Sequence, residues 1–227
     1  MNNIVAVIPV KKNSSRLPNK NILPFEDTTL LEYKIKQLKK IDKISEIIVS
    51  SDSDEMLSIA LKNGVTIDER PIEHANESRP FSEFLLYLTS QFKKEHQHMM
   101  WACCTSPLVD VERYEEAINI YLNKLDKKEC DSLITVYEYK HFMLDEKGPM
   151  NFKPGPAHVN SQDLPSFDIF TNGIILSPIE SVKKWQYHFG SNPYRLYVNQ
   201  IEAIDIDTEF DYHCALAGYK LLQSKKQ

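Results

Sequence analysis

Three features of the sequence predict a three-layer α/β fold, in which helices cover both faces of a mostly parallel β-sheet and an arm protrudes. Short apolar segments of strand length alternate with segments whose apolar residues recur at helical spacing. The strand-like segments are almost continuously apolar, as is typical of strands buried on both faces. The alternation stops at residues 140–171, where prolines and glycines accumulate without a helical period.

The elements before this irregular stretch follow one another in a regular order. Residues 4–10 form an apolar run of strand length, and the apolar residues of 30–41 recur at helical spacing. A strand at 46–51 precedes a helix that Gly64 ends. The remaining elements of this half are the segment 65–70, a helix with apolar residues from Phe84 to Phe92, a buried strand at 99–104, a helix over 111–125 and a strand at 132–139.

The sheet resumes after the irregular stretch. Residues 172–178 return to it, and a short helix, a strand at 194–199 and a last helix follow. Thr208 is placed to cap that last helix. A long irregular insertion in a compact domain is usually a functional loop, a lid or an oligomerisation arm. We therefore assign residues 1–139 and 172–227 to one α/β domain and residues 140–171 to an inserted dimerisation or substrate arm.

Composition excludes several classes of function. The chain has 227 residues, enough to bury a substantial core. Its formal net charge of −5 does not favour binding to nucleic acid or to an anionic membrane. No window approaches the roughly 18 apolar residues of a membrane helix. The four cysteines form no C-x-x-C pair, so we expect free thiols in a reducing cytoplasm.

A basic loop follows the first predicted strand. Within ten residues it carries four cations: Lys11, Lys12, Arg16 and Lys20. Ligands of such sheets bind outside the carboxyl ends of the strands, which is where this loop lies. We predict that Lys11, Lys20 and Arg16 neutralise a bound polyphosphate. The alternative is ordinary solvated charge on an exposed loop.

The residues between these cations suit an anion site. Asn13, Ser14 and Ser15 tolerate the tight conformations in which backbone N–H groups converge on an anion. The loop has neither the glycines of a Walker A motif nor those of a Rossmann motif, since the first glycine of the chain is Gly64. A P-loop ATPase and a dehydrogenase are therefore disfavoured.

Two aspartates near the C-terminus form a second candidate site. The run IDID places Asp205 and Asp207 on one face of a predicted strand, with Ile204 and Ile206 turned to the core. Two carboxylates on one face are costly unless a cation or water compensates. Mg²⁺ suits the pair because it binds one or two carboxylates plus waters and phosphate oxygens. The alternative is an ordinary half-exposed strand edge.

The basic loop and the carboxylate pair together predict nucleotidyl transfer. In such a reaction an acceptor oxygen attacks the α-phosphorus of a nucleoside triphosphate in line, and pyrophosphate leaves. Mg²⁺ and lysines neutralise the triphosphate, and catalysis comes mainly from positioning and charge stabilisation.

Seven motifs follow one another over nearly the whole chain: IPVKKNSSRLPNKN, EIIVSSDSDE, ERPIE, CTSPL, SQDLP, NGIILS and IDIDTEFD. In order and spacing they resemble the acylneuraminate cytidylyltransferases, the CMP-sialic acid synthetase family. The resemblance implies a homodimeric enzyme with the nucleotide-diphospho-sugar transferase fold. It also implies a reaction in which CTP and a 2-keto sugar acid give a CMP-sugar and pyrophosphate, with Mg²⁺ as cofactor.

The resemblance also implies roles for individual residues. Lys20, Lys11 and Asp207 match catalytic positions, and Asp205 and Asp207 match metal ligands. The nucleotide site matches Lys11, Asn13, Ser14, Arg16, Lys20, Asn21, Arg70 and Cys103. The sugar-acid site matches Thr105, Ser106, Gln162 and Asn172. Residues 140–171 match an arm that crosses into the partner subunit and helps to complete its site.

Several positions depart from the family pattern. Lys11 stands where the family usually has arginine, and lysine lacks the planar bidentate fork. Cys103 and Val109 replace a glutamine and an arginine, and Ser161 replaces the arginine before QDLP. Arg16 resembles the S-x-R-L-P-x-K run of the sister CMP-KDO synthetases. The alternatives are therefore a CMP-KDO-type synthetase or a nucleotide-binding homologue without catalysis; a glycosyltransferase with a D-x-D site would carry that motif in mid-chain.

Overall fold

The computed structural model describes residues 3–12, 14, 16–76, 78–156 and 158–225. Seven strands form its central sheet: β1 (Ile4–Pro9), β4 (Ile44–Ser51), β5 (Thr66–Glu69), β6 (His98–Trp101), β7 (Ser132–Tyr139), β10 (Phe167–Pro178) and β11 (Pro193–Tyr197). Their order across the sheet is β11-β7-β10-β6-β1-β4-β5. Only β10 runs antiparallel to its neighbours in this sheet, so the predicted mostly parallel sheet is confirmed.

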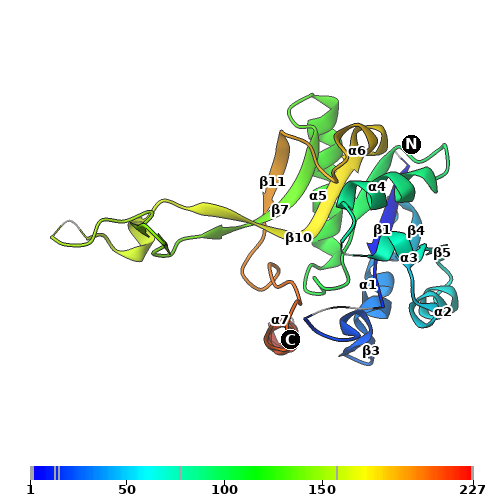
Figure 1. Ribbon diagram of the computed structural model, residues 1–227, viewed down its shortest axis with the longest axis horizontal. Helices are drawn as coiled ribbons and strands as arrows, with labels where there is room; N and C mark the ends of the chain where they lie inside the picture. The colour runs from blue at the N-terminus through cyan, green and yellow to red at the C-terminus, as the bar shows by residue number, and fades with distance from the viewer. Residues whose placement is uncertain (1–2, 13, 15, 77, 157, 226–227) are drawn as a thin grey trace.

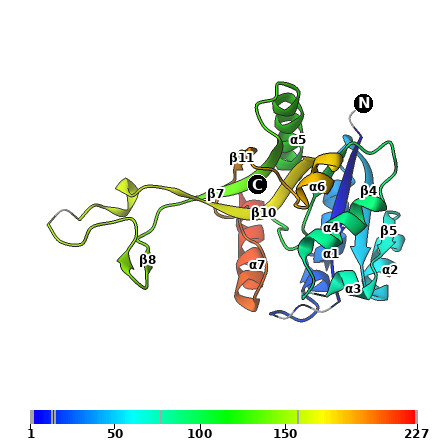
Figure 2. The ribbon, with the colours of Figure 1, turned by 45° about the horizontal axis from the view of Figure 1, so that its top comes forward.

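Helices cover both faces of the sheet (Figures 1 and 2). They are α1 (Leu30–Leu38), α2 (Asp54–Lys62), α3 (Ile72–Ala75), α4 (Phe81–Ser90), α5 (Val111–Asp126), α6 (Ile179–Trp185) and α7 (Glu209–Ser224). Alternate residues of β1 face opposite layers: Ile4, Ala6 and Ile8 pack with α1, α2 and α5, whereas Val5 and Val7 pack with α4 and α6. The three-layer prediction is therefore confirmed.

The last helix closes a third, smaller apolar cluster. Ala215 of α7 packs there with Leu30, Leu108 and Phe25, the last residue of the short strand β2 (Pro24–Phe25) that pairs with β3 (Thr28–Thr29). Thr208 caps α7 as predicted, because its hydroxyl accepts a hydrogen bond from the N–H of Asp211. Among the described residues, no helix combines the length and the apolar character needed to cross a bilayer.

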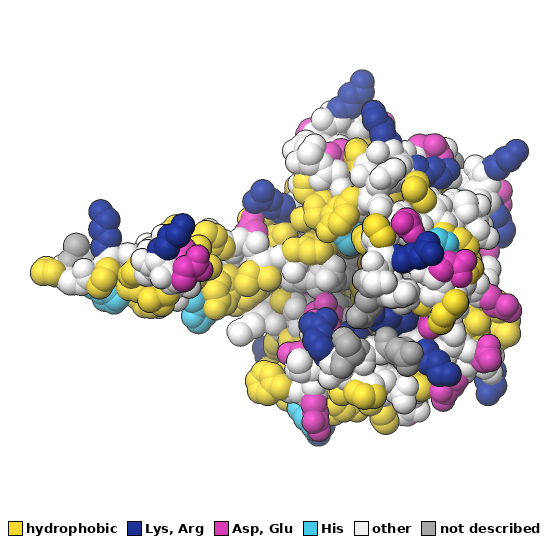
Figure 3. All heavy atoms as spheres, viewed as in Figure 1, with side chains coloured by type: hydrophobic (Ala, Val, Ile, Leu, Met, Phe, Trp, Pro, Cys, Tyr) yellow, Lys and Arg dark blue, Asp and Glu magenta, His cyan; other side chains and the backbone are white. Residues whose placement is uncertain are grey.

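An arm projects from the sheet between β7 and β10 (Figure 1). It contains β8 (Leu144–Asp145), β9 (Gly148–Pro149) and the 3₁₀ helix η2 (Ser161–Asp163). Its stem is a two-stranded ribbon, since β10 begins at Phe167 and pairs with β7 from there; the sequence places the return to the sheet later, at Asn172. Large apolar side chains remain exposed along the arm (Figure 3), among them Phe142, Leu144, Met150 and Val159.

One predicted strand is wrong. Residues 204–207 form no strand, because the connection between β11 and α7 lies outside the sheet and pairs with none of its strands. The predicted alternation of faces nevertheless holds. Ile206 is fully buried and Ile204 packs against the same cluster, whereas Asp205 and Asp207 line a cavity.

Candidate active site

A cavity of about 440 Å³ opens beyond the carboxyl ends of β1, β5 and β6. Its lining combines basic loop, aromatic and carboxylate residues, including Lys11, Ser14, Lys20, Asn21, Arg70, Phe81, Phe84, Trp101, Cys103, Thr105, Asp205 and Asp207. A second cavity of about 620 Å³ shares Lys11 and Ser14 with it, so the basic loop borders both. Most of the residues predicted for the nucleotide and metal sites therefore meet in one place.

Lys20 and Arg16 both hold the carboxylate of Asp207. Lys20 begins the 3₁₀ helix η1 (Lys20–Ile22), and its Nζ lies 2.8 Å from Asp207 Oδ1 and 3.1 Å from the carbonyl oxygen of Ile206. Arg16 Nη1 lies 2.8 Å from Asp207 Oδ2. The Lys20 side chain is only 16% exposed, so this ion pair is screened less than a surface pair. The basic loop and the carboxylate pair thus form one electrostatic unit.

Asn21 joins the basic loop to the end of β6. Its side chain is buried, its Nδ2 donates to the carbonyl of Lys11 at 3.2 Å, and its Oδ1 accepts from Cys104 Sγ at 3.3 Å. These contacts fix the loop backbone on one side of the cavity. Asn13, also predicted for the nucleotide site, lies outside the described residues.

Asp205 is the most perturbed carboxylate of the cavity. Burial raises its pKa, and the negative charge of Asp207 raises it further, while the side chains of Thr105 and Asn172 act in the opposite direction. Its Oδ1 is buried and has no hydrogen-bond partner among the described residues. The backbone beside it is fixed because the N–H of Ile206 donates to the carbonyl of Thr105 at 2.8 Å.

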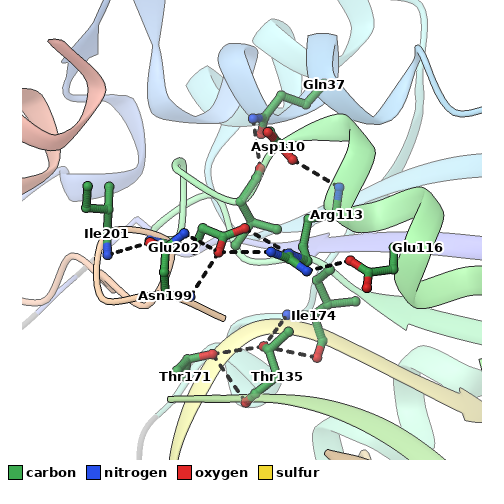
Figure 4. Close-up of polar contacts among 11 residues, drawn as sticks. Gln37, Asp110, Arg113, Glu116, Thr135, Thr171, Ile174, Asn199, Ile201 and Glu202 are labelled. Atoms are coloured by element: carbon green, nitrogen blue, oxygen red, sulfur yellow. Dashed lines mark hydrogen bonds and ion pairs between the residues drawn. The ribbon is translucent and has the colours of Figure 1, made fainter. Parts of the chain in front are cut away.

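Asn172 reaches Asp205 because β10 is irregular at this point. The register with β7 shifts between Phe170 and Ile175, and Asn172 adopts a left-handed conformation with φ of 54°. Thr135 of β7 holds the bulge: its hydroxyl accepts from the N–H of Ile174 at 3.0 Å, and Thr171 Oγ1 lies 2.8 Å from it (Figure 4).

The donor set fits a divalent cation. A buried carboxylate oxygen without a partner, beside a second carboxylate, is what a cation would compensate. The described residues contain no group of three or more His, Cys, Asp or Glu side chains able to hold a metal. Asp205 and Asp207 would therefore hold the cation together with phosphate oxygens and water.

Arg70 and three aromatic side chains form the other wall of the cavity. The guanidinium of Arg70 donates to Ser50, with Nη2 2.6 Å from the carbonyl oxygen and Nε 3.1 Å from Oγ. It lies 4.1 Å from the ring centre of Phe84. Phe81 and Trp101 meet edge to face at 5.6 Å. Although burial lowers the pKa of Arg70 to about 10, the group stays charged at neutral pH.

The remaining predicted residues lie in different places. Cys103 lines the cavity, but burial raises the pKa of its thiol well above the usual range, so it is not a thiolate nucleophile. Ser106 is buried and does not line the cavity. Gln162 belongs to η2, on the projecting arm away from the cavity (Figure 1).

Sequence reasoning missed Lys34. This lysine is fully buried in α1, where its Nζ donates to the carbonyl of Ser106 at 3.0 Å and to Tyr114 Oη at 2.8 Å. Tyr114 in turn donates to the carbonyl of Gly173 at 3.3 Å, so Lys34 and Tyr114 link the segment that follows β6 to the irregular part of β10. A signal was present: Lys34 lies three residues after Leu31 and one before Ile35, on the apolar face of the helix.

The fold and the cavity are those of a nucleotidyltransferase-type protein, since Lys11 and Lys20 face two carboxylates beyond the ends of a mostly parallel sheet. Residues 5–148, more than half of the chain, match the family model described as Cytidylyltransferase, and the chain belongs to this family. The family predicted from the sequence motifs is therefore confirmed.

Individual relatives agree with this assignment. The N-acylneuraminate cytidylyltransferase of Escherichia coli O18:K1:H7 is 30% identical over 132 residues, which are 58% of this chain and 31% of the relative. A Helicobacter pylori protein named pseudaminic acid cytidylyltransferase and UDP-2,4-diacetamido-2,4,6-trideoxy-beta-L-altropyranose hydrolase is 24% identical over 210 residues, 89% of this chain and 40% of the relative. The chain thus spans less than half the length of either relative.

Among solved structures, CMP:2-keto-3-deoxy-manno-octonic acid synthetase complexed with CTP superposes with a TM-score of 0.69. The two sequences are 13% identical, and the superposition covers 99% of this chain and 100% of the other. At this identity the similarity shows the fold, which agrees with the predicted α/β architecture.

Proposed function

We propose that the protein transfers the cytidylyl group of CTP to a 2-keto sugar acid of the sialic-acid-like nonulosonic type, releasing pyrophosphate. The observation that carries this proposal is the Lys20–Asp207–Arg16 cluster beside the buried, unpartnered oxygen of Asp205. The relatives named N-acylneuraminate and pseudaminic acid cytidylyltransferases support the class of acceptor.

In this reaction the anomeric hydroxyl of the sugar acid attacks the α-phosphorus and releases its proton to solvent water. The new oxygen–phosphorus bond forms as the bond between the α-phosphorus and its bridging oxygen to the β-phosphorus breaks, and pyrophosphate carries away the displaced charge. Lys20 lies deepest in the basic loop and stabilises the charge that develops on the α-phosphate. Arg16 and Lys11 neutralise the rest of the triphosphate, and the aromatic wall packs against the base.

We propose that Asp205 and Asp207 would hold a divalent cation, Mg²⁺. The bound cation supplies charge neutralisation of the triphosphate and orients it for in-line attack. The chain's own contribution is to hold both carboxylates at the cavity. Lys20 and Arg16 pair with Asp207, and the side chains of Thr105 and Asn172 oppose the rise that burial causes in the pKa of Asp205.

We further propose that the protein is a cytoplasmic homodimer. The exposed apolar side chains of the arm support this, since large apolar patches on a soluble protein mark interaction sites (Figure 3). In such a dimer the arm carries Gln162 toward the sugar-acid site of the partner. Asn172 and Thr105 belong to the sugar-acid site of the same chain.

Calorimetric titration of CTP, UTP, ATP and GTP, with and without Mg²⁺, tests the nucleotide site first. We expect selective, Mg²⁺-dependent binding of CTP. Release of pyrophosphate is then measured with N-acetylneuraminate, pseudaminate and 3-deoxy-manno-octulosonate as acceptors. Asp207→Asn should abolish release while thermal unfolding stays unchanged. Binding of CTP without release for any acceptor would favour a non-catalytic homologue, and release with the octulosonate alone would favour a CMP-KDO-type synthetase.

A further inference from the structure

The segment 199–207 carries both candidate metal ligands although it belongs to no helix or strand. It joins β11 to α7. The N–H of Ile206 donates a hydrogen bond to the carbonyl of Thr105, which connects the segment to the floor of the cavity. An irregular segment holds a carboxylate in place only where other contacts fix its backbone. The source of that rigidity therefore bears directly on the metal site.

Glu202 supplies four of these contacts, all in the first half of the segment or from it to α5. Its carboxylate accepts from Arg113 Nε at 2.8 Å and Nη2 at 3.3 Å. It also accepts from Asn199, from the backbone N–H at 2.9 Å and from Nδ2 at 2.6 Å (Figure 4). Asn199 Oδ1 accepts in turn from the N–H groups of Ile201 and Glu202, at 2.9 and 3.1 Å. The first half of the segment is thus closed into a loop around one carboxylate.

The side chain of Glu202 is only 8% exposed, and the two N–H groups of Arg113 face it as a fork. A fork-like arginine pair fixes direction as well as distance, which a lysine cannot do. A buried ion pair often contributes little to the stability of a fold. Stability alone therefore does not explain the Arg113–Glu202 pair.

Arg113 is itself rigidly placed. It lies in the first turn of α5, and its N–H donates to Asp110 Oδ1, the helix cap, at 3.0 Å. Just before this cap, Gln37 of α1 donates to the carbonyls of Pro107 and Val109 at 3.1 and 3.0 Å. The start of α5 is therefore bound to α1 and continues directly into the cavity floor.

We propose that Arg113 and Glu202 are positioning residues that hold Asp205 and Asp207 at the cavity. The pair joins the carboxylate segment to the start of α5, and the Ile206–Thr105 bond joins it to the floor that precedes α5. Together with the bonds from Lys20 to the carbonyl of Ile206 and from the N–H of Asp207 to Asp211, these two attachments fix the positions of both aspartates at the cavity. The consequence for metal binding rests on the proposed function, whereas the effect on the segment does not.

Glu202→Gln and Arg113→Lys test the proposal, with Glu116→Gln as the matched control. Glu116 pairs with the same arginine but is exposed, so its loss leaves the Glu202 contacts in place. Hydrogen exchange of the protein without nucleotide is measured over residues 199–208. We expect exchange there to rise at least tenfold in both test variants and to stay unchanged in the control, while exchange in α7 and β1 stays unchanged.

The second readout is the Mg²⁺ concentration that half-saturates CTP binding in calorimetry. Outer partners of a metal ligand typically contribute about 10–100-fold to metal affinity, so we expect an increase of that size.

Unchanged exchange in segment 199–208 would overturn the proposal whatever the protein binds. Faster exchange with an unchanged Mg²⁺ requirement would also overturn it. Failure of the wild-type protein to bind CTP would refute the proposed function and leave the exchange comparison to decide the positioning role. Should Glu202→Gln unfold, the milder Arg113→Lys decides.

Discussion

Replacing the buried Lys34 with methionine should change how the stability of the protein depends on pH. Lys34 is fully buried, and burial lowers the pKa of its amine from 10.5 to about 7, partly offset by Cys103 and Cys104. Its two hydrogen-bond partners, the carbonyl of Ser106 and the hydroxyl of Tyr114, carry no charge to compensate a cation.

The sign follows from the proton each state holds. Below pH 7 the lysine is protonated in both states, and the folded state bears the full cost of a buried charge. Between pH 7 and 10.5 the unfolded chain keeps the proton that the folded chain has lost, so the free energy of unfolding rises by about 1.4 kcal/mol per pH unit. The contribution over pH 7–9 is therefore roughly 3 kcal/mol, an upper value because relaxation and water penetration reduce the shift.

Urea unfolding of the wild type and Lys34→Met at pH 6, 7, 8 and 9 measures this effect. The difference in the free energy of unfolding, wild type minus variant, should be flat from pH 6 to 7 and then rise in favour of the wild type. Lys36→Met is the control, since Lys36 is exposed on the same helix and pairs with Glu32. A difference for Lys34→Met that is constant from pH 7 to 9 would refute the assignment of a buried amine that ionises near neutrality.

Three further outcomes are expected. Lys20→Met should lower kcat/KM for CTP, measured by pyrophosphate release, by on the order of 10²–10³-fold without changing thermal unfolding. A loss below tenfold would contradict the proposed contact of Lys20 with the α-phosphate. Gly190→Ala should destabilise the fold by about 1–3 kcal/mol in urea unfolding, because the new Cβ would lie 2.3 Å from Asp131 Oδ2, which the N–H of Asn192 holds. Leu144→Glu, which places charge on an exposed apolar side chain of the arm, should shift the mass in light scattering from dimer to monomer; an unchanged dimer would remove the arm from the interface.

Periodicity predicted most of the fold because it reports local burial. The apolar run at residues 4–10 became β1, whose alternate side chains fill two cores, and the stripe over 30–41 became α1. The antiparallel direction of β10 could not be predicted in this way, since strand direction depends on how the arm returns the chain. Asp205 and Asp207 illustrate the same limit of periodicity. Their period-two alternation predicts a strand, whereas the segment is held by Glu202 and Thr105 and pairs with no strand of the sheet.

The same distinction applies to the candidate site: residues in local motifs can be predicted from the sequence, whereas residues that depend on a distant partner cannot. The sequence motifs predict that Lys20, Asn21 and Asp205 belong to one site, and the structure places all three in the lining of one cavity. Arg113 could not be predicted in this way, because its value depends on a partner 89 positions away. Val109 stands where the resemblance predicts arginine, and Arg113 lies four positions later, in the first turn of α5. No local pattern connects that arginine to Glu202; only the fold brings them together.

The partners of Asp207 also explain how the site can remain organised before a nucleotide binds. Lys20 and Arg16 are the groups that we propose to neutralise the triphosphate, yet in this structure both are bonded to Asp207. When a triphosphate binds, Lys20 and Arg16 would turn from Asp207 to phosphate oxygens, and Asp207 would then be free to hold a divalent cation. Both basic side chains thus face an anionic oxygen before and after binding, which limits the electrostatic reorganisation that the reaction requires. The arrangement requires that Asp207 stay fixed during this exchange, which is the reason to look for rigidity in the segment that Arg113 and Glu202 hold.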